Sequence, residues 1–479
     1  MAVLDHLEPG RVFHYFEELC AIPHGSGNTK AVSDWCVAFA KARGLEYHQD
    51  DANNVIIIKE ASTGYEQAEP MILQGHLDMV CEQDATCAKD MEREGLDLAV
   101  DGDWVYAKGT TLGGDDGIAV AMALAILDDD TISHPRLEVV LTTDEEVGML
   151  GAAVLDASPL KGRQLLNVDS EDEGVFTVSC AGGSRAYCCV PVTRETFDGA
   201  VLRVRVFGLA GGHSGVEIHK GRANADILLG RLLWEMASST TVRLVSVNGG
   251  LKDNAIPVLA EAVVCVEQAD VAKTAAEELA KDLQNEYRAA DSGLTVEVME
   301  ADTKEMPMDA DSTKRVLCFL NCVPNGVQEM SQDISGLVQT SLNLGILKTE
   351  TDVVSADFSV RSSIASQKEM LHHRLRCLTE QLGGTVELSG VYPAWEYRAD
   401  STLRERMVDV FQEQYGYAPK IEAIHAGLEC GLLCGKLPDL DCVSIGPDLM
   451  EIHTPRERMS VASVQRVWAF VLEVLKRSR

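Results

Sequence analysis

The amino-acid sequence predicts an α/β domain with a mostly parallel central sheet, plus an inserted α+β domain with two lobes. Near the N-terminus, short apolar runs such as 54–59 (NVIIIK) alternate with helical segments, which is typical of a parallel sheet covered by helices. From about residue 187 the pattern changes: 201–207 (VLRVRVF) alternates strictly, like a strand with one solvated face. After residue 392 the helix–strand pattern returns. We therefore assign residues 1–186 and 393–479 to the first domain and 187–392 to the insertion.

The elements of the first domain follow from apolar spacing and stop signals. Residues 9–21 and 28–43 carry apolar side chains at helical spacing, and Gly44 marks a helix end. β-Branched or apolar runs predict the strands. We expect helices at 9–21, 28–43, 118–128, 401–415, 428–435 and 461–476, and strands at 54–59, 70–80, 137–143, 165–169 and 441–445.

The insertion shows one pattern of strands and helices twice. The first copy has expected strands at 201–207, 242–247, 258–266 and 294–299, and helices at 222–236 and 271–288. The second, looser copy has strands at 337–342, 352–361 and 385–388, and a helix at 367–382. Each lobe is therefore expected to be an antiparallel sheet with helices on one face. The copies agree in architecture and not residue by residue.

Composition excludes several classes of function. Lys and Arg number 42 against 75 Asp and Glu, a formal charge of −33, which disfavours binding to nucleic acid or to an anionic membrane. The apolar run 118–127 is too short to span a membrane, and the N-terminus resembles no secretion signal, so we expect a cytoplasmic protein. The 14 cysteines are scattered without a CxxC pair, which favours free thiols.

Two segments place metal-binding types of side chain beside predicted elements. In QGHLDMV (74–80), His76 and Asp78 share one face of a strand, so the carboxylate can orient the imidazole. In GTTLGGDDG (109–117), Asp115 and Asp116 stand at the start of an apolar helix. Taken alone, His76 has an ordinary reading as a structural histidine, and the two acids as a helix cap.

Three further segments add acids and a second histidine. Residues 142–148 (TTDEEVG) and 167–170 (NVDS) follow buried strands, and 451–455 (EIHTP) carries His453 in a short loop. A run of acids in a loop is usually a solvated surface. Considered together, however, the five segments supply two histidines and at least three carboxylates, a donor set that suits a pair of zinc, manganese or cobalt ions. Clustered acids would repel one another without such cations.

The combined motifs QGHLDMV, GTTLGGDDG, TTDEEVG, NVDSEDEG and EIHTPRER resemble those of the M20 family of dinuclear metallopeptidases, and within it the cytosolic aminoacyl-histidine (Xaa-His, carnosinase-like) dipeptidases. The resemblance covers nearly the whole chain. It implies a phosphorylase/hydrolase-like catalytic domain, a lid formed by the insertion, and two divalent ions, with Zn²⁺ first and Mn²⁺ or Co²⁺ as alternatives.

The resemblance also implies roles for individual residues. His76, Asp115 and Asp169 would hold one metal; Asp115, Glu146 and His453 would hold the other, with Asp115 bridging. Asp78 would orient His76, and Glu145 would be the general base that activates a metal-bridged hydroxide. Many relatives have Asn where this chain has Asp116, which leaves open whether Asp115 or Asp116 bridges and whether Asp116 contributes to the site.

In the lid, the resemblance implies contacts to the substrate from His213, Asn254 and Arg361, with Gly427 in a loop that approaches the substrate. The expected substrate is a small unblocked dipeptide such as Xaa-His. A two-lobed lid favours donation of His213 within one chain and leaves a homodimer open.

Three alternatives compete with a metallo-dipeptidase. The same metal chemistry fits an N-acyl amino acid deacylase or another exopeptidase of the family, because only the shape of the pocket decides between them. A non-catalytic binding protein is disfavoured by the complete set of ligands and base. A cysteine hydrolase using Cys430 or Cys81 has no supporting spacing.

Overall fold

The computed structural model describes residues 3–479, which form two compact units. Within these residues, unit 1 runs to Ser179 and adds Tyr397–Ala423 and Leu428–Arg479. Unit 2 comprises Cys180–Glu396 and the short segment Ile424–Gly427. No helix in the described part of the chain is long and apolar enough to cross a membrane.

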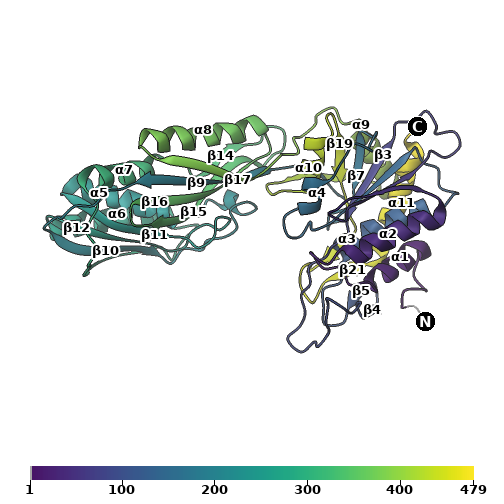
Figure 1. Cartoon of the computed structure of the whole chain (residues 1–479), viewed down its shortest axis with the longest axis horizontal. Coiled ribbons are helices and arrows are strands. Elements are labelled where there is room, and N and C mark those ends of the chain that lie inside the picture. Colours follow the sequence, from purple (N-terminus) through teal and green to yellow (C-terminus); the bar gives the residue numbers. More distant parts are fainter. Residues whose placement is uncertain (1–2) are drawn as a thin grey trace. The chain divides into compact units, whose positions relative to one another are not determined.

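In the described residues, unit 1 combines seven helices, which are labelled in Figure 1, with two sheets. The helices are α1 (Gly10–Cys20), α2 (Lys30–Arg43), α3 (Gly114–Leu127), α4 (Leu150–Val154), α9 (Thr402–Tyr415), α10 (Glu429–Lys436) and α11 (Val461–Arg477). The strands are β1 (Glu46–Gln49), β2 (Val55–Lys59), β3 (Met71–His76), β4 (Leu98–Asp101), β5 (Trp104–Ala107), β6 (Leu137–Thr142), β7 (Gln164–Asn167), β19 (Asp441–Ser444), β20 (Leu449–Met450) and β21 (Arg458–Ser460), with β8 (Val175–Cys180) and β18 (Lys420–Ile424) at the boundary with unit 2.

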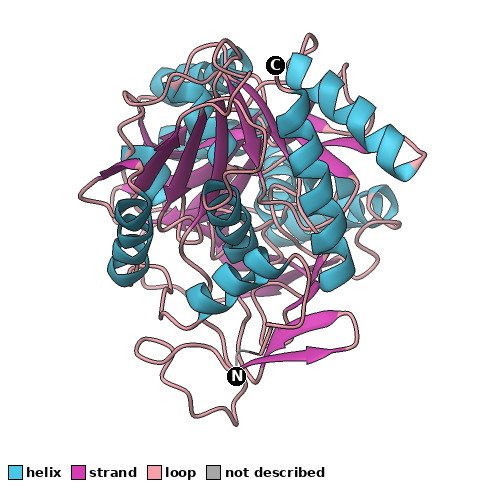
Figure 2. Cartoon of the chain, turned by 90° about the vertical axis from the view of Figure 1, so that its right-hand side faces the viewer, coloured by secondary structure: helices cyan, strands magenta, loops and turns pink. Residues whose placement is uncertain are grey.

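The main sheet of unit 1 is parallel at its centre, as the sequence predicts. Its strand order is β1-β2-β6-β3-β7-β19-β8-β18, and the pairs β6–β3, β3–β7 and β7–β19 are parallel. The pairs β1–β2, β2–β6 and β19–β8 are antiparallel. Figure 2 shows these strands side by side with helices packed against them.

The central strands are apolar because helices cover the sheet. Every residue of β3, β6 and β7 is buried, as expected for parallel strands enclosed on both faces. Helix α3 packs on α1 and β3, and nearly all of its residues are buried. The carboxyl ends of parallel strands lie at one edge of the sheet. His76, Thr142 and Asn167 therefore end three neighbouring strands at the same edge.

Unit 2 has one large sheet covered by helices. The helices are α5 (Ala225–Ser239), α6 (Ala269–Glu286), α7 (Ala310–Cys322) and α8 (Ala365–Gln381), with a short 3-10 turn η1 (Ile218–Lys220). The strands are β9 (Gly182–Pro191), β10 (Ala200–Phe207), β11 (Val242–Gly249), β12 (Ala260–Val266), β13 (Thr295–Glu300), β14 (Gly326–Met330), β15 (Val338–Thr349), β16 (Val353–Ser362) and β17 (Thr385–Tyr392). The four α-helices lie on one face of the sheet (Figure 1). Their buried side chains and those of the strands form an extended apolar core.

The repeated pattern predicted from the sequence is present in the order of the strands. The chain order β10-α5-β11-β12-α6-β13 gives the sheet order β11-β12-β10-β13, and β9-α7-β15-β16-α8-β17 gives the equivalent order β15-β16-β9-β17. The sequence predicts a separate sheet for each lobe, whereas in the structure the two lobes join edge to edge through Gly249 and Leu347. Glycines permit this junction, because a Cβ at Gly250 would lie 1.9 Å from the carbonyl oxygen of Gly345.

Several elements were not predicted. Helix α7 begins at an Asp309 cap whose carboxylate accepts a hydrogen bond from Ser312 N at 2.7 Å, and its apolar spacing was a usable signal. The β4–β5 hairpin is short, and Gly102 at its turn adopts a positive φ of 59°. Strand β9 contains two glycines and two adjacent cysteines, which weakens its alternation.

Asn224 links the two repeats of unit 2. Its Oδ1 caps α5 by accepting hydrogen bonds from the N–H groups of Asp226 (3.0 Å) and Ile227 (3.3 Å), and its Nδ2 donates to the carbonyl of Leu344 in β15 (2.8 Å).

We expect Asn224→Ala to lower the free energy of unfolding by about 1–3 kcal/mol, because it removes a cap and leaves a buried carbonyl without its donor. Asn224→Ser, which keeps a capping oxygen, should lose less. Urea unfolding of the three proteins measures both effects, and equal stability would contradict the assignment.

Candidate metal centre

Asp115 lies between two histidines that are far apart in the sequence. Its Oδ1 is 3.1 Å from Nε2 of His76, and its Oδ2 is 3.2 Å from Nε2 of His453. Burial raises the pKa of Asp115, but hydrogen bonds with both histidines outweigh it and hold that pKa well below its usual range. One carboxylate with an imidazole at each oxygen is the arrangement that a bridging ligand requires.

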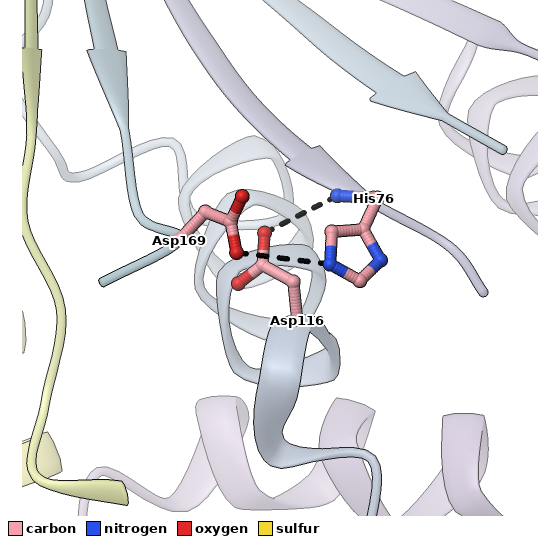
Figure 3. A group of neighbouring side chains, drawn as sticks. All are labelled: His76, Asp116 and Asp169. Atoms are coloured by element: carbon pink, nitrogen blue, oxygen red, sulfur yellow. Dashed lines mark hydrogen bonds and ion pairs between the residues drawn. The ribbon is translucent and has the colours of Figure 1, made fainter. Parts of the chain in front are cut away.

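His76 is oriented by its other ring nitrogen. The imidazole is buried at the end of β3, and its Nδ1 lies 2.9 Å from the backbone carbonyl of Asp78, which can only accept a hydrogen bond. Nδ1 therefore carries a proton. Burial lowers the pKa of His76, but hydrogen bonds with Asp115, Asp169 and Asp78 outweigh it and raise that pKa well above its usual range, so in the metal-free protein Nε2 is protonated as well and donates to the acids. Asp169 lies close on this side, with Oδ1 3.7 Å from Nε2 (Figure 3).

The carboxylate of Asp78 mainly fixes a neighbouring loop. Its Oδ1 lies 3.5 Å from Nδ1 of His76 but accepts a hydrogen bond from the N–H of Glu145 at 3.0 Å. Its Oδ2 accepts from the N–H of Glu146 (3.3 Å) and from Oγ of Ser26 (2.8 Å). Asp78 thus holds both glutamates next to His76, a role that the sequence did not reveal.

Asp116 is buried beside β3. Its Oδ2 accepts a hydrogen bond from the backbone N–H of His76 at 3.2 Å, as Figure 3 shows. A Cβ at position 75 would lie 2.5 Å from this oxygen, so Gly75 makes room for the carboxylate. Burial and the charge of Asp169 raise the pKa of Asp116 well above its usual range. One of its oxygens is thus already engaged with the backbone.

Three overlapping groups of side chains have ligand atoms within 4.8 Å of one another: His76, Asp116 and Asp169; His76, Glu145 and Glu146; and Asp115, Glu146 and His453. His453 completes the third group, because its Nε2 is also 3.0 Å from Oε1 of Glu146. The five segments predicted from the sequence therefore converge in unit 1. Nitrogen and carboxylate donors in this combination suit zinc, manganese or cobalt.

Without cations the acids of this cluster are electrostatically unfavourable. Burial, with the negative charges of Asp169, Glu429 and Glu146, raises the pKa of Glu145 to about 9. Burial and Asp115 raise the pKa of Asp169 to about 7. The raised pKa values mean that ionising these neighbouring carboxyl groups together costs free energy. Bound cations offset that cost. The residues present thus fit a divalent metal site.

Two buried glutamates, Glu457 and Glu429, hold the segments that carry the ligands in place. Neither of them was identified from the sequence. Glu457 accepts hydrogen bonds from the N–H groups of Leu112 (2.8 Å), Gly113 (3.2 Å) and Gly114 (2.8 Å), so it fixes the turn that leads into Asp115. It lies four residues after His453 and so connects the two loops that carry ligands. EIHTPRER contains this Glu, but a carboxylate that binds backbone has no sequence signature of its own.

Glu429, the first residue of α10, supports the strand ends. Its Oε2 accepts hydrogen bonds from Nε2 of Gln74 and from Oγ1 of Thr142, both at 2.6 Å. Asn167 donates in turn to Oε1 of Gln74 at 2.6 Å. Burial raises the pKa of Glu429 to about 7. This chain of polar contacts joins β6, β3 and β7 below the ligands.

Backbone conformation in the ligand loops is unusual. His453 and Glu451 have positive φ values of 59° and 52°, and Asp144 and Met149 have values of 54° and 58°. Residues other than glycine adopt this region at an energetic cost, and such residues concentrate at functional sites. Asp144 is held there by the N–H of Gly27, which donates to its Oδ1 at 2.6 Å.

The predicted substrate contacts His213, Asn254, Arg361 and Gly427 all belong to unit 2. The N–H groups of Gly215 (3.1 Å) and Val216 (3.2 Å) donate to Nδ1 of His213, so Nε2 carries the proton and is a donor. Asn254 is exposed, and its backbone carbonyl accepts a hydrogen bond from the N–H of Ser214 at 2.8 Å. The structure thus places the exposed residue Asn254 beside the loop of His213.

The cysteines do not form a competing site. Cys430 is buried in α10, and Cys81 is exposed. Burial and the charges of Glu92 and Glu82 raise the pKa of Cys81, which disfavours the reactive thiolate.

The pH dependence of the metal-free protein tests the contacts of His453. Hydrogen bonds with Asp115 and Glu146 raise the pKa of His453 to about 10, from about 6.5 for an ordinary histidine. The stabilisation by this imidazolium is fully present below the unfolded pKa and is lost as the pH rises through the folded pKa. We expect the difference in unfolding free energy between metal-free wild type and His453→Gln to shrink as the pH rises from about 6.5 to about 10. Urea titrations with chelator, below, within and above this pH range, measure the difference. A constant value would contradict the contacts.

Residues 72–477 match the model of peptidase family M20/M25/M40. The chain is 36% identical over 480 aligned residues, 99% of both chains, to a protein of Escherichia coli named cytosol non-specific dipeptidase. It matches the crystal structure of aminoacylhistidine dipeptidase from Vibrio alginolyticus with a TM-score of 0.94 and 36% identity, covering 99% of this chain and 97% of that one. Aminopeptidase PepT from Bacillus cereus, at 15% identity and TM-score 0.57 over 98% and 99% of the two chains, shares the fold.

Proposed function

The chain belongs to peptidase family M20/M25/M40, and from that premise we propose that it is a metal-dependent dipeptidase with two divalent ions in unit 1. The observation that carries the proposal is the position of Asp115, whose two oxygens face two different histidines. Each histidine has a further carboxylate beside it, Asp169 near His76 and Glu146 near His453. Two complete half-sites around one carboxylate suit two ions better than one.

His76, Asp115 and Asp169 would hold one ion, and Asp115, Glu146 and His453 the other. Asp116 is the less suitable bridge, because one of its oxygens binds the backbone of His76. The protonated Nδ1 of His76 leaves its Nε2 lone pair for a metal. The donor set favours Zn²⁺ and also admits Mn²⁺ or Co²⁺. When bound, such a pair of ions polarises the scissile carbonyl and activates water.

Glu145 is the proposed proton carrier. It is partly buried, stands beside the ligand Glu146, and has a pKa raised to about 9 in the absence of metal. Positive charge in the cluster lowers that pKa towards neutrality, where a group can both take and return a proton efficiently. Glu145 would accept a proton from the attacking water and pass it to the departing amine. Asp78 holds its backbone for this task.

The substrate class rests on the relatives. One relative is named a non-specific dipeptidase and the other an aminoacylhistidine dipeptidase, each 36% identical to this chain. Together they support hydrolysis of unblocked dipeptides, with Xaa-His among them, over the alternatives of an N-acyl amino acid deacylase or another exopeptidase. The word cytosol in the name of the first relative supports a cytoplasmic location.

A substrate panel on metal-reconstituted protein tests this function. Chelator-treated protein should be inactive, and Zn²⁺, Mn²⁺ or Co²⁺ should restore hydrolysis of Xaa-His and other dipeptides, because the acids and histidines need the ions to organise water. Tripeptides and N-acyl amino acids form the comparison arms. Activity that survives metal removal, or preference for N-acyl substrates, would overturn the proposal.

Glu145→Gln separates the base from the ligands. We expect kcat to fall by roughly 10²–10⁴-fold while both metals remain bound, because the amide cannot carry the proton. Glu146→Gln is the matched control and should lose metal as well as activity. Metal analysis and steady-state kinetics of the two variants decide the point; an active Glu145→Gln enzyme would remove this residue from its role.

A further inference from the structure

A row of side chains crosses four strands of unit 2. Ser341 of β15 pairs with Arg361 of β16, Arg361 pairs with Gly183 of β9, and Gly183 pairs with Tyr392 of β17. Residues directly opposite each other on neighbouring strands project from the same face of a sheet. Arg361 therefore stands between Ser341 on one side and Tyr392 on the other, where Gly183 leaves space for the phenol.

Arg361 lacks an anionic partner. Its Nη1 donates to the hydroxyl of Tyr392 at 3.2 Å, but its Nε is buried and has no hydrogen-bond partner. Among residues 3–479 no Asp or Glu forms an ion pair with this guanidinium. Buried polar groups in proteins are nearly always satisfied, so an unpaired guanidinium N–H indicates a missing acceptor.

His425 lies next to Arg361 and has the same deficit. Only 6% of the residue is exposed, and its Nε2 is 2.7 Å from Oγ of Ser341, the cross-strand neighbour of Arg361. Its Nδ1 is buried without a partner. The backbone on both sides is fixed, because the N–H of Ala181 donates to the carbonyls of Ile424 (3.2 Å) and Ala426 (3.0 Å).

The protonation of His425 follows from its surroundings. Burial and the positive charge of Arg361 lower its pKa to about 3, so the imidazole is neutral and carries one proton. When the Ser341 hydroxyl donates to Nε2, that proton resides on Nδ1. Nδ1–H is then a second unused donor beside Nε–H of Arg361.

The loop of His213 closes around the same point. A Cβ at position 215 would lie 3.1 Å from Nε of Arg361, 2.9 Å from Cε1 of His213 and 2.8 Å from the carbonyl oxygen of His425. Gly215 is therefore the small residue around which all three groups gather. The charge of Arg361 also lowers the pKa of His213, after burial. The local field is positive and favours an anion.

We propose that His425 is a further substrate-binding residue, whose Nδ1–H binds, together with Arg361, the terminal carboxylate of a peptide with a free C-terminus. The inference rests on the proposed function. Two N–H donors match the two oxygens of one carboxylate, and one positive charge neutralises it. Ser341 acts as a positioning residue that holds the tautomer. The site would make the enzyme select peptide acids over the corresponding C-terminal amides.

Two variants of His425 test the claim atom by atom. Asn places an amide N–H near the position of Nδ1, whereas Gln reaches towards Ser341 and leaves the Nδ1 position empty. The readout is the ratio of kcat/KM for a dipeptide to kcat/KM for its C-terminal amide, measured with metal-loaded enzyme. We expect His425→Gln to lower this ratio roughly 10- to 100-fold through a higher KM for the acid, with kcat nearly unchanged. His425→Asn should keep this ratio close to the wild-type value, because it retains an N–H donor near the position of Nδ1.

Ser341→Ala tests the same site through the residue that holds the tautomer of His425. It should lower the acid-to-amide ratio by a smaller factor than His425→Gln, with metal content unaltered. A purely structural effect would reduce activity on the acid and the amide alike and leave the ratio unchanged, which would overturn the role of His425. If wild type hydrolyses dipeptides but His425→Gln retains the full ratio, this inference fails while the proposed function stands. Inactivity of metal-loaded wild type on every dipeptide would defeat the proposed function first.

Discussion

Mutual repulsion among buried acids is the constraint around which unit 1 is built. Asp115, Asp116, Glu145, Glu146 and Asp169 meet at one edge of the sheet with only two histidines among them. Burial and neighbouring negative charge raise the pKa values of several of these carboxyl groups. A chain can hold such groups together only if the backbone is fixed independently of them. Strand ends, a buried helix start and two supporting glutamates provide that fixation, and cations supply the missing charge.

The supporting contacts show how the backbone is fixed. Asp78 binds the N–H groups of Glu145 and Glu146, and Glu457 binds three consecutive N–H groups before Asp115. In each case the carboxylate accepts hydrogen bonds from main-chain N–H groups and so positions another residue. Such contacts rigidify the ligand loops before any ion arrives, which lowers the ordering cost of binding.

The sequence predicted the elements whose pattern is local. Apolar runs located β2, β3, β6 and β7, and helical spacing with Gly44 located α2. The acids of the site were visible as residues that follow strands, but their grouping into ligands depended on the family resemblance. The roles assigned to individual residues stay predictions. Glu429, Glu457 and His425 were not identified, because each acts through backbone or through one distant side chain, and no periodicity marks such contacts.

The joining of the two repeats of unit 2 into one sheet could not be predicted from local sequence patterns either. Strict alternation in 201–207 indicated one wet face, and that face is present in β10. Whether two repeats form two sheets or one depends on a single pair at their edges, Gly249 with Leu347, and on glycines that let backbones approach. Edge-to-edge pairing removes two free strand edges, which are otherwise liable to pair with other chains.

The place of β19 in the main sheet sets an order of events during synthesis. This strand, Asp441–Ser444, lies between β7 and β8, although both of those are translated more than two hundred residues earlier. Until it leaves the ribosome, the main sheet of unit 1 lacks the strand that joins β7 to β8, whereas unit 2 is complete by Glu396 except for Ile424–Gly427. The insertion can therefore fold before the main sheet of unit 1 receives β19, the last of that sheet's strands in chain order. The nascent N-terminal part must keep its apolar strands from aggregating for that interval, and its high negative charge is suited to the task.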